Sequence, residues 1–293
     1  MCESRKSLNR LDRNRPIGIF DSGVGGLTVY RALHERLHNE RFIYLGDTAR
    51  VPYGTKSLAT VERYAVENAK FLEARGIKLL VVACNTASAL ALPAIRRAVG
   101  VAVIGVIEPG AKAAIAVAQG KTIGVIATEA TVQSGAYSKA IASMDHQVRV
   151  IERACPLFVS LAEEGWANTD VARAVARDYL ASFRSESPAT LVLGCTHYPI
   201  LREVISETVG SSVKLIDSGE AAAAEVSNIL RESQLAQAEH EWLNERELCD
   251  DLDHFYVTDA AERFARVAER FLGSAPSILE AVEIWGHDEL RTY

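Results

Sequence analysis

Two cysteines in this chain lie in nearly matching sequence contexts, and a thiol can move a proton to or from a carbon atom. Cys84 and Cys195 each follow a short apolar run, and a threonine comes within two residues of each. Such runs are typical of buried strands, and open parallel sheets place their chemistry beyond the carboxyl ends of the strands. The offset between the two cysteines (195 − 84 = 111) indicates two similar halves that face one cleft. Each half would then supply one acid–base group, on opposite sides of a substrate.

Other roles for the two cysteines explain less of the pattern. A single free cysteine is most often a small buried hydrophobe, but the repeated context argues against simple core packing. An odd count of five cysteines, and a basic N-terminal stretch with no apolar segment behind it, disfavour a secreted disulfide protein. A zinc site would need clustered cysteines or histidines, and a cysteine protease would leave Cys84 unexplained. We assign structural or incidental roles only to Cys2, Cys155 and Cys249.

A histidine stands two residues beyond the second cysteine. On extended backbone, residues two apart project to the same side, so Cys195 and His197 can face one cleft. A cation beside a sulfur favours the thiolate, which is the form that removes protons. His197 is therefore the predicted partner of Cys195. Asn85, Thr86 and Thr196 would add neutral hydrogen-bond donors for substrate carboxylates.

A glycine-rich segment, DSGVGG at residues 21–26, follows a predicted strand and opens a predicted helix. Its glycine spacing does not match the dinucleotide fingerprint, and it has no P-loop lysine. Free backbone N–H groups at a helix N-terminus bind anions, so a substrate carboxylate could bind here without a cofactor. Asp21 could either assist Cys84 or only cap the helix that follows.

The composition bounds the class of protein. The 293 residues are 48% hydrophobic and 24% charged, which is ordinary for a globular protein with one large or two medium domains. No apolar run approaches the length that crosses a bilayer, so we expect no membrane association. A net charge of −6, without a basic stripe, predicts no nucleic-acid partner. Usable reduced thiols indicate the cytoplasm.

Short β-rich runs alternate with longer amphipathic stretches from residue 16 onward, which predicts an α/β fold with parallel, helix-covered sheets. Helices are expected over 57–75 and 87–99. The run at 121–128 repeats the pattern of 15–22 at an offset (123 − 17 = 106) close to that of the cysteines. We therefore expect two similar parallel-sheet α/β domains related by pseudo-symmetry, with the active site in the cleft between them.

The same patterns predict the domain boundaries. Residues 1–15 are expected to be a disordered N-terminal extension, residues 16–109 plus 221–293 the first domain, and residues 110–220 the second. We expect the C-terminal stretch to pack back on the first half. The polar, acid-rich residues 234–253 are expected to form an exposed connection.

Seven segments carry a resemblance to a known family. Over residues 16–273, nearly its whole length, the chain is similar to glutamate racemases. DSGVGG, GDTARVPYG and GCTHYP, in this order, are highly specific, whereas aspartate and hydantoin racemases usually lack the DTARVPYG block and the histidine after Cys-Thr. The segments are GIFDSGVGGLTV, YLGDTARVPYGTKS, VVACNTASA, GVIEPG, IGVIATEATVQSGAY, ACPLFVSLAEEG and LVLGCTHYP.

The resemblance implies an enzyme that interconverts L- and D-glutamate through a carbanion-like intermediate, without cofactor or metal. By the family's pattern, Cys84 takes the proton from D-glutamate, Cys195 takes it from L-glutamate, and the opposite thiol reprotonates the carbon. The supporting acid–base residues fall on Asp21, His197 and Glu163, with Glu164 adjoining the last. The substrate contacts fall on Asp21, Ser22, Tyr53, Gly54, Asn85, Thr86, Thr196 and His197.

The resemblance also implies a cellular role and partners. D-glutamate made in this way supplies peptidoglycan, which indicates a bacterial cytoplasmic enzyme. Family members form homodimers, and some, which tend to carry N-terminal extensions, require a muramyl-peptide precursor as activator. Two other functions stay open: racemisation of aspartate or a related acid, and non-catalytic binding on the same fold. Formation of D-glutamate without pyridoxal phosphate would distinguish the three.

Overall fold

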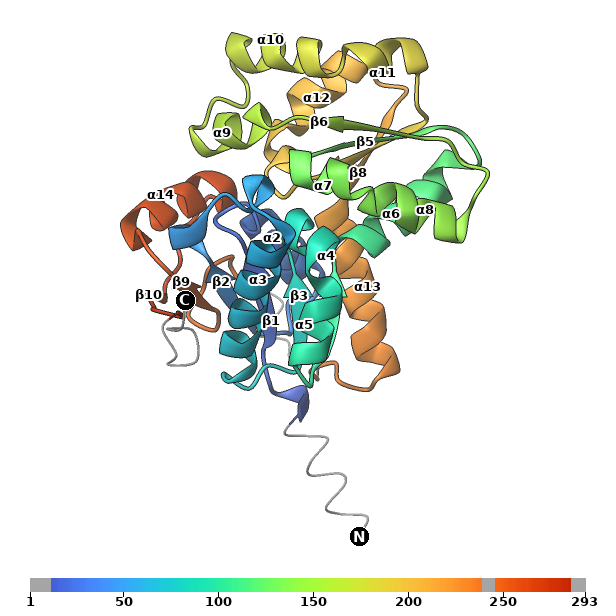
Figure 1. Cartoon of the computed structure of the whole chain (residues 1–293). Coiled ribbons are helices and arrows are strands. Elements are labelled where there is room, and N and C mark those ends of the chain that lie inside the picture. The colour runs from blue at the N-terminus through green and yellow to red at the C-terminus, as the bar shows by residue number, and fades with distance from the viewer. Residues whose placement is uncertain (1–11, 239–245, 286–293) are drawn as a thin grey trace.

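The computed structural model describes residues 12–238 and 246–285, and these form two parallel β-sheets covered by helices (Figure 1). This confirms the predicted fold class, an α/β protein with two parallel sheets. Most of the expected N-terminal extension, residues 1–11 with Cys2, lies outside the described residues, as do residues 239–245 and 286–293.

Within the described residues, the first sheet has six strands in the order β10-β9-β2-β1-β3-β4, and the second has four in the order β6-β5-β7-β8. All the neighbouring strands pair in parallel. The first sheet contains β1 (Ile17–Asp21), β2 (Phe42–Gly46), β3 (Leu79–Val82), β4 (Ala102–Gly105), β9 (His254–Val257) and β10 (Leu279–Ala281). The second contains β5 (Ile123–Ala127), β6 (Val150–Ala154), β7 (Thr190–Gly194) and β8 (Lys214–Asp217).

Helices cover both sheets and make most of the crossover connections between parallel strands. Short 3₁₀ turns at Thr48–Arg50, Tyr53–Thr55 and Tyr198–Leu201 lie in the loops. The helices are α2 (Leu27–Arg36), α3 (Leu58–Glu73), α4 (Asn85–Leu90), α5 (Leu92–Ala98), α6 (Ile107–Ala118), α7 (Glu129–Ser134), α8 (Ala136–Met144), α9 (Leu157–Glu163), α10 (Asp170–Tyr179), α11 (Ala181–Glu186), α12 (Arg202–Val209), α13 (Ser218–Glu232) and α14 (Ala261–Leu272).

The helix expected over 57–75 is α3, which Ser57 caps by accepting a hydrogen bond from the Thr60 backbone N–H. The single helix expected over 87–99 is instead two, α4 and α5, and the first begins at Asn85, directly after Cys84. Pro93 explains the break, because it has no N–H to donate and its ring clashes with the preceding turn of a continuous helix.

The central strands place both cysteines at corresponding edges. Strands β1 and β5 are buried along their whole lengths, and each lies between two parallel neighbours. Cys84 follows the end of β3 by two residues, and Cys195 directly follows β7. Because β3 pairs with β1 and β7 pairs with β5, the two thiols extend from equivalent positions of the two sheets.

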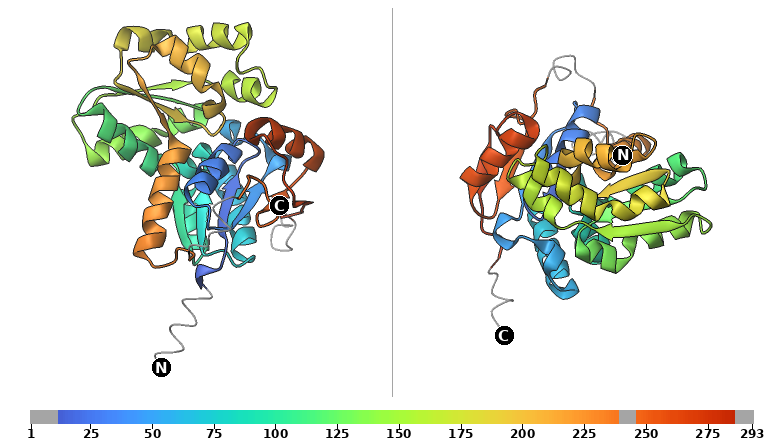
Figure 2. Two further views of the ribbon diagram at one scale, coloured as in Figure 1. Left: turned by 180° about the vertical axis from the view of Figure 1, so that it is seen from behind. Right: turned by 90° about the horizontal axis from the view of Figure 1, so that it is seen from above.

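The chain returns to the first sheet after β8. Helix α13 begins at the end of the second sheet and packs against α2, as the view from behind also shows (Figure 2). Strand β9 then pairs with β2, and β10 with β9. The domain boundaries at 109/110 and 220/221 stay a prediction.

The expected exposed connection over 234–253 is wrong for its described C-terminal part. Cys249 is buried, and the Asp253 side chain is fully buried. The Asp253 carboxylate accepts hydrogen bonds from Tyr30 Oη at 2.8 Å and the Phe42 backbone N–H at 2.9 Å, and it pairs with Arg246. Asp253 and Arg246 therefore form a buried ion pair at the start of β2, which composition alone could not reveal.

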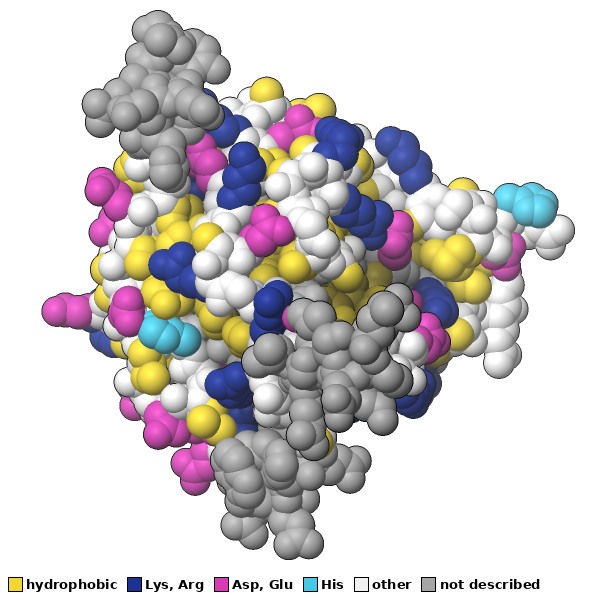
Figure 3. All heavy atoms as spheres, turned by 90° about the horizontal axis from the view of Figure 1, so that it is seen from below, with side chains coloured by type: hydrophobic (Ala, Val, Ile, Leu, Met, Phe, Trp, Pro, Cys, Tyr) yellow, Lys and Arg dark blue, Asp and Glu magenta, His cyan; other side chains and the backbone are white. Residues whose placement is uncertain are grey.

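The molecular surface carries charges of both signs. On the face seen from below, acidic and basic side chains are interspersed with apolar and uncharged ones (Figure 3). None of the helices in the described ranges has the length and apolar character needed to cross a membrane.

Candidate active site

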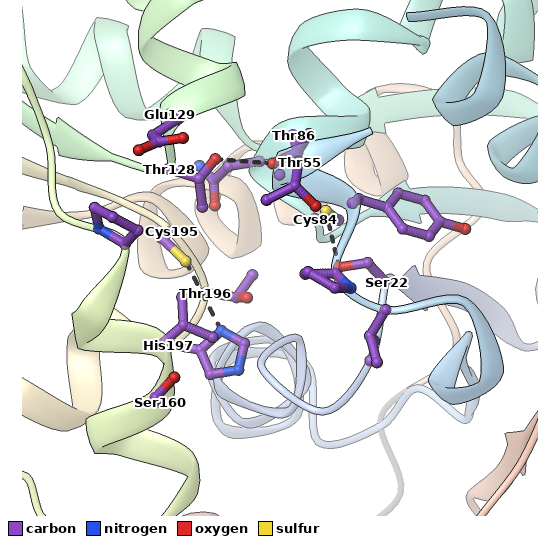
Figure 4. Close-up of a pocket in the computed structure, with 18 of the residues that line it drawn as sticks. Ser22, Thr55, Cys84, Thr86, Thr128, Glu129, Ser160, Cys195, Thr196 and His197 are labelled. Atoms are coloured by element: carbon purple, nitrogen blue, oxygen red, sulfur yellow. Dashed lines mark hydrogen bonds between the residues drawn. The ribbon is translucent and has the colours of Figure 1, made fainter. Parts of the chain in front are cut away.

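A cavity of about 200 Å³ lies between the two halves, at the ends of β3 and β7. Figure 4 shows Cys84 and Cys195 on opposite sides of it. The volume is below the roughly 300–1,000 Å³ of pockets for drug-sized ligands, so it suits a molecule no larger than an amino acid. The lining contains ten of the predicted residues: Ser22, Tyr53, Gly54, Cys84, Asn85, Thr86, Glu163, Cys195, Thr196 and His197.

The Cys84 side of the cavity favours a neutral thiol. Its Sγ donates to Ser22 Oγ at 3.2 Å, and the side chain is only 5% exposed. Burial, together with the nearby Asp21 carboxyl, raises the pKa of Cys84 to about 12. At neutral pH this residue therefore carries a proton that it can donate.

The Cys195 side contains a charged partner. Cys195 Sγ lies 3.8 Å from His197 Nδ1, and His197 Nε2 lies 3.1 Å from Glu163 Oε1. Burial opposes the charge on His197, but its hydrogen bonds to Cys195 and Glu163 outweigh burial and raise the pKa of His197 to about 10. The imidazole is therefore cationic at neutral pH, and a cation at this position stabilises a thiolate at Cys195. Glu163, not the adjoining Glu164, makes the contact.

The predicted site residue Asp21 lies beneath the cavity instead of in its lining. It is fully buried, and its Oδ2 accepts from the Gly23 backbone N–H at 2.9 Å, so the carboxyl turns back into its own loop. Its Oδ1 has no hydrogen-bond partner among the described residues. Burial raises the pKa of Asp21, although the positive charge of His197 opposes this shift. A buried carboxyl of this kind holds a proton more readily than an exposed one.

Asn85 follows β3 and Thr196 follows β7, and their polar atoms are only partly occupied by hydrogen bonds within the described part of the protein. Asn85 Nδ2 donates to Tyr137 Oη at 2.8 Å, whereas the buried Asn85 Oδ1 has no partner among the described residues. The backbone oxygen of Thr196 accepts from Thr28 Oγ1 at 2.8 Å, and Thr196 lines the cavity. The Asn85 amide oxygen therefore has hydrogen-bonding capacity that no described residue uses.

Tyr53 contributes its ring to the wall but turns its hydroxyl away. That hydroxyl donates to Asp47 Oδ2 and accepts from Asn68 Nδ2 at 3.0 Å. Arg50 donates to the same carboxylate at 2.8 Å. The cluster fixes the turn that carries Gly54, where an added Cβ would lie 3.2 Å from Thr128.

Sequence reasoning missed several lining residues, of which Thr128 is the most informative. It stands at the offset of the internal repeat from Ser22 (128 − 22 = 106), so both halves place a hydroxyl directly after their first strand. Thr128 Oγ1 lies 3.0 Å from Thr86 Oγ1, across the cleft. The repeat itself was the signal that could have found it. The other lining residues outside the prediction are Gly23, Val51, Pro52, Thr55, Glu129, Pro156, Val159 and Ser160.

The loop before α2 approaches the other half closely at one glycine. A Cβ on Gly25 would lie 2.3 Å from Thr196 Oγ1 and 2.4 Å from His197 Nδ1, which no side chain could tolerate without movement. At the repeat offset (131 − 25 = 106) the second half has Thr131, which lies 3.4 Å from Thr86. His197 and Thr86 likewise correspond at the cysteine offset (197 − 86 = 111). Gly25 therefore faces the imidazole of His197, whereas at the equivalent position of the other half the larger Thr131 faces Thr86.

Comparison with known proteins shows the family of the chain. The family model described as Asp/Glu/Hydantoin racemase matches residues 17–226. A glutamate racemase from Geobacter metallireducens is 54% identical over 88% of this chain and 93% of its own length, and one from Chlorobium phaeobacteroides is 47% identical over 92% and 96%. The chain belongs to the glutamate racemase family.

Solved structures of this family share the architecture. The glutamate racemase of Francisella tularensis, in complex with D-glutamate, has a TM-score of 0.84 at 40% identity and covers 93% of this chain and 98% of its own. An aspartate racemase from Picrophilus torridus has a TM-score of 0.53 at 20% identity, and that likeness shows the fold alone. Among the described residues, no group of three or more histidine, cysteine, aspartate or glutamate side chains is placed to hold a metal ion.

Proposed function

We propose that this glutamate racemase interconverts L- and D-glutamate by passing the α-proton between Cys195 and Cys84. The observation that carries the proposal is the cavity that both thiols reach from equivalent strand ends of the two halves. Neither thiol alone could both remove and replace a proton on opposite faces of one carbon. The role of this family is to supply D-glutamate for peptidoglycan.

In the direction from L-glutamate, the Cys195 thiolate removes the α-proton and becomes a thiol. The electron pair of the broken C–H bond stays on Cα and spreads into the adjacent carboxylate. The Cys84 thiol, kept neutral by burial, then delivers its proton to the opposite face and becomes a thiolate. The other direction runs these steps in reverse. Proton exchange with the surroundings returns each sulfur to its starting state.

We assign the supporting roles by position. His197 stabilises the Cys195 thiolate, and Glu163 orients the imidazole and holds its charge. Asp21, which lies near Cys84 without lining the cavity, serves that thiol as a proton and charge partner. Ser22, Asn85, Thr86 and Thr196 bind the substrate's polar groups, with the free Asn85 Oδ1 suited to its ammonium, and the Tyr53 ring and Gly54 form the wall.

The test of this function is formation of D-glutamate from L-glutamate by enzyme that has been dialysed against EDTA, without added pyridoxal phosphate. We expect full activity, since the proposed steps use only groups of this chain. Aspartate offered in place of glutamate tests the other racemase function, and glutamate binding without turnover would indicate a binding protein. Activity that depends on added metal or pyridoxal phosphate would overturn the proposal.

The oligomeric state, the cellular compartment and the activator of this enzyme are proposals as well. We propose a cytoplasmic homodimer, which light scattering on the purified chain would test. The Escherichia coli glutamate racemase, 30% identical, has been crystallised with L-glutamate and the activator UDP-MurNAc-Ala. A muramyl-peptide precursor is accordingly the candidate activator here, and racemisation measured with and without UDP-MurNAc-Ala tests it.

A further inference from the structure

Glu163 is held from three directions, and two of them come from the C-terminal helix α14. Its Oε1 contacts His197 Nε2 at 3.1 Å, and its Oε2 accepts from the Arg263 guanidinium at 3.1 Å. Arg270 donates to the backbone oxygen of Glu163. Arg270 also lies over Gly165, where an added Cβ would come within 2.9 Å of its guanidinium. The helix therefore clamps the end of α9, which carries the glutamate.

Helix α14 also contacts the imidazole itself. The ring of Phe271 meets the ring of His197 edge-to-face, with 6.2 Å between centroids. The same helix packs against α2 and β10 of the first half, and Phe264 lies against Tyr44. Figures 1 and 2 show α14 beside α9, across the boundary between the two halves. Its residues lie beyond the stretch 17–226 that the family model matches.

We propose that α14 is a positioning element for proton transfer at Cys195, acting through Arg263 and Arg270 on Glu163 and through Phe271 on His197. This rests on the proposed two-thiol function. Arg263 occupies Oε2 and so leaves Oε1 as the oxygen that faces the imidazole. Without it, the carboxylate can rotate about its terminal bond, and the imidazolium loses a fixed partner. His197 and Arg263 hold the pKa of Glu163 below its usual range, although burial acts in the opposite direction. Glu163 therefore stays charged while these two contacts are made.

The contacts predict an effect on one thiol, since the groups held by α14 serve Cys195. Arg263 is 57% exposed and Glu163 is 24% exposed, and such surface ion pairs contribute little to folding stability. Removing Arg263 is therefore expected to leave the fold intact while it disturbs the Glu163–His197 pair. The expected signature is a slower proton transfer at Cys195, with transfer at Cys84 unaltered.

The experiment compares Arg263→Ala with Arg263→Lys and with Arg266→Ala. Arg266 lies on the same helix, is exposed, and makes no ion pair within the described part of the chain, so it is a matched control for loss of one positive charge. We expect kcat from L-glutamate to fall about 10-fold in Arg263→Ala, part of the roughly 10²–10⁴-fold that acid–base assistance supplies. The lysine variant should recover part of this loss, and Arg266→Ala should match the parent.

The decisive readout is the primary isotope effect with α-deuterated substrates. In Arg263→Ala the effect with deuterated L-glutamate should increase, because abstraction by Cys195 becomes more rate-limiting, and the effect with deuterated D-glutamate should not. Unchanged isotope effects in Arg263→Ala, or equal changes in Arg266→Ala, would overturn the positioning role. A parent enzyme that does not racemise glutamate at all would instead refute the two-thiol function, so the two failures are distinguishable.

Discussion

At the scale of single residues, the two thiols differ in their surroundings. Cys84 is a buried neutral thiol beside a serine hydroxyl and a buried carboxyl, whereas Cys195 faces a cationic imidazole. These surroundings suit Cys84 as a proton donor, and a cation beside Cys195 favours a thiolate there. Racemisation from L-glutamate needs a donor at Cys84 and an acceptor at Cys195, and the reverse direction needs the two states exchanged.

Replacing either thiol should stop the reaction in both directions. Cys84→Ala and Cys195→Ala remove one of the two groups that every turnover needs, so we expect racemisation to fall below detection. The serine variants should keep at most a trace, because a hydroxyl is a far weaker proton carrier than a thiol. Cys249→Ala is the matched control, a buried cysteine away from the cavity, and it should stay active. Substantial activity in either single alanine variant would contradict the two-base scheme.

His197 should be charged at neutral pH because of its hydrogen bonds to Cys195 and Glu163. NMR of isotope-labelled imidazoles should show His197 titrating near pH 10, while His34, whose pKa burial and Arg246 lower to about 4, stays neutral at pH 7. Glu163→Gln should lower the pKa of His197. Since that pKa is raised above its ordinary 6.5, the stability it contributes is full below pH 6.5 and is lost as pH rises through about 10. A His197 resonance that titrates near 6.5 in the parent would refute the charged pair.

At the scale of elements, the loops after equivalent strands reach across the cleft. The sequence could predict Cys84, Cys195 and His197, because a strand end fixes where the next two or three residues point. It could not predict that Asp21 turns back to Gly23, since that depends on the turn's own hydrogen bond. It also could not predict that Arg263 meets Glu163, since a contact between residues 100 apart depends on how α14 packs.

Gly25 should be required for catalysis because its backbone touches the other half. In Gly25→Ala the new Cβ would overlap Thr196 and His197, so one of the loops must move and the imidazole loses its place beside Cys195. We expect kcat to fall by about 10²-fold, the cost of roughly 1 Å of misplacement. Gly100→Ala is the control, because a Cβ there meets only Glu73 Oε1 at an ordinary 3.5 Å. Parent-like kcat in Gly25→Ala would show that the close approach has no role.

At the scale of the whole molecule, a buried ion pair ties distant segments of the first half together. Lys78 pairs with Glu40, with side chains only 1% and 3% exposed. Lys78 Nζ also donates to the backbone oxygens of Arg13 at 2.7 Å and Leu235 at 2.9 Å. The pair thereby joins the start of the described chain, the entry to β3 and the segment that follows α13.

Breaking this pair should destabilise the fold without changing the chemistry. Glu40→Gln leaves Lys78 buried and unpaired, and such changes cost about 3–5 kcal/mol. The double variant Glu40→Leu with Lys78→Met should recover much of this loss, since it leaves no uncompensated charge. Urea denaturation measures the free energy of unfolding, and kcat of the folded variants should match the parent. A loss below about 1 kcal/mol in Glu40→Gln would show that the pair is not needed.

Transfer of the α-proton through two separate thiols can be followed directly in D₂O. L-glutamate is incubated with the enzyme, and the Cα hydrogen of both enantiomers is measured by NMR at early conversion. If Cys195 removes the proton and Cys84 delivers a different one, newly formed D-glutamate carries deuterium at Cα while the remaining L-glutamate stays largely protiated. D-glutamate that keeps its protium would mean that a single group carries the proton across, and that result would contradict the two-thiol mechanism.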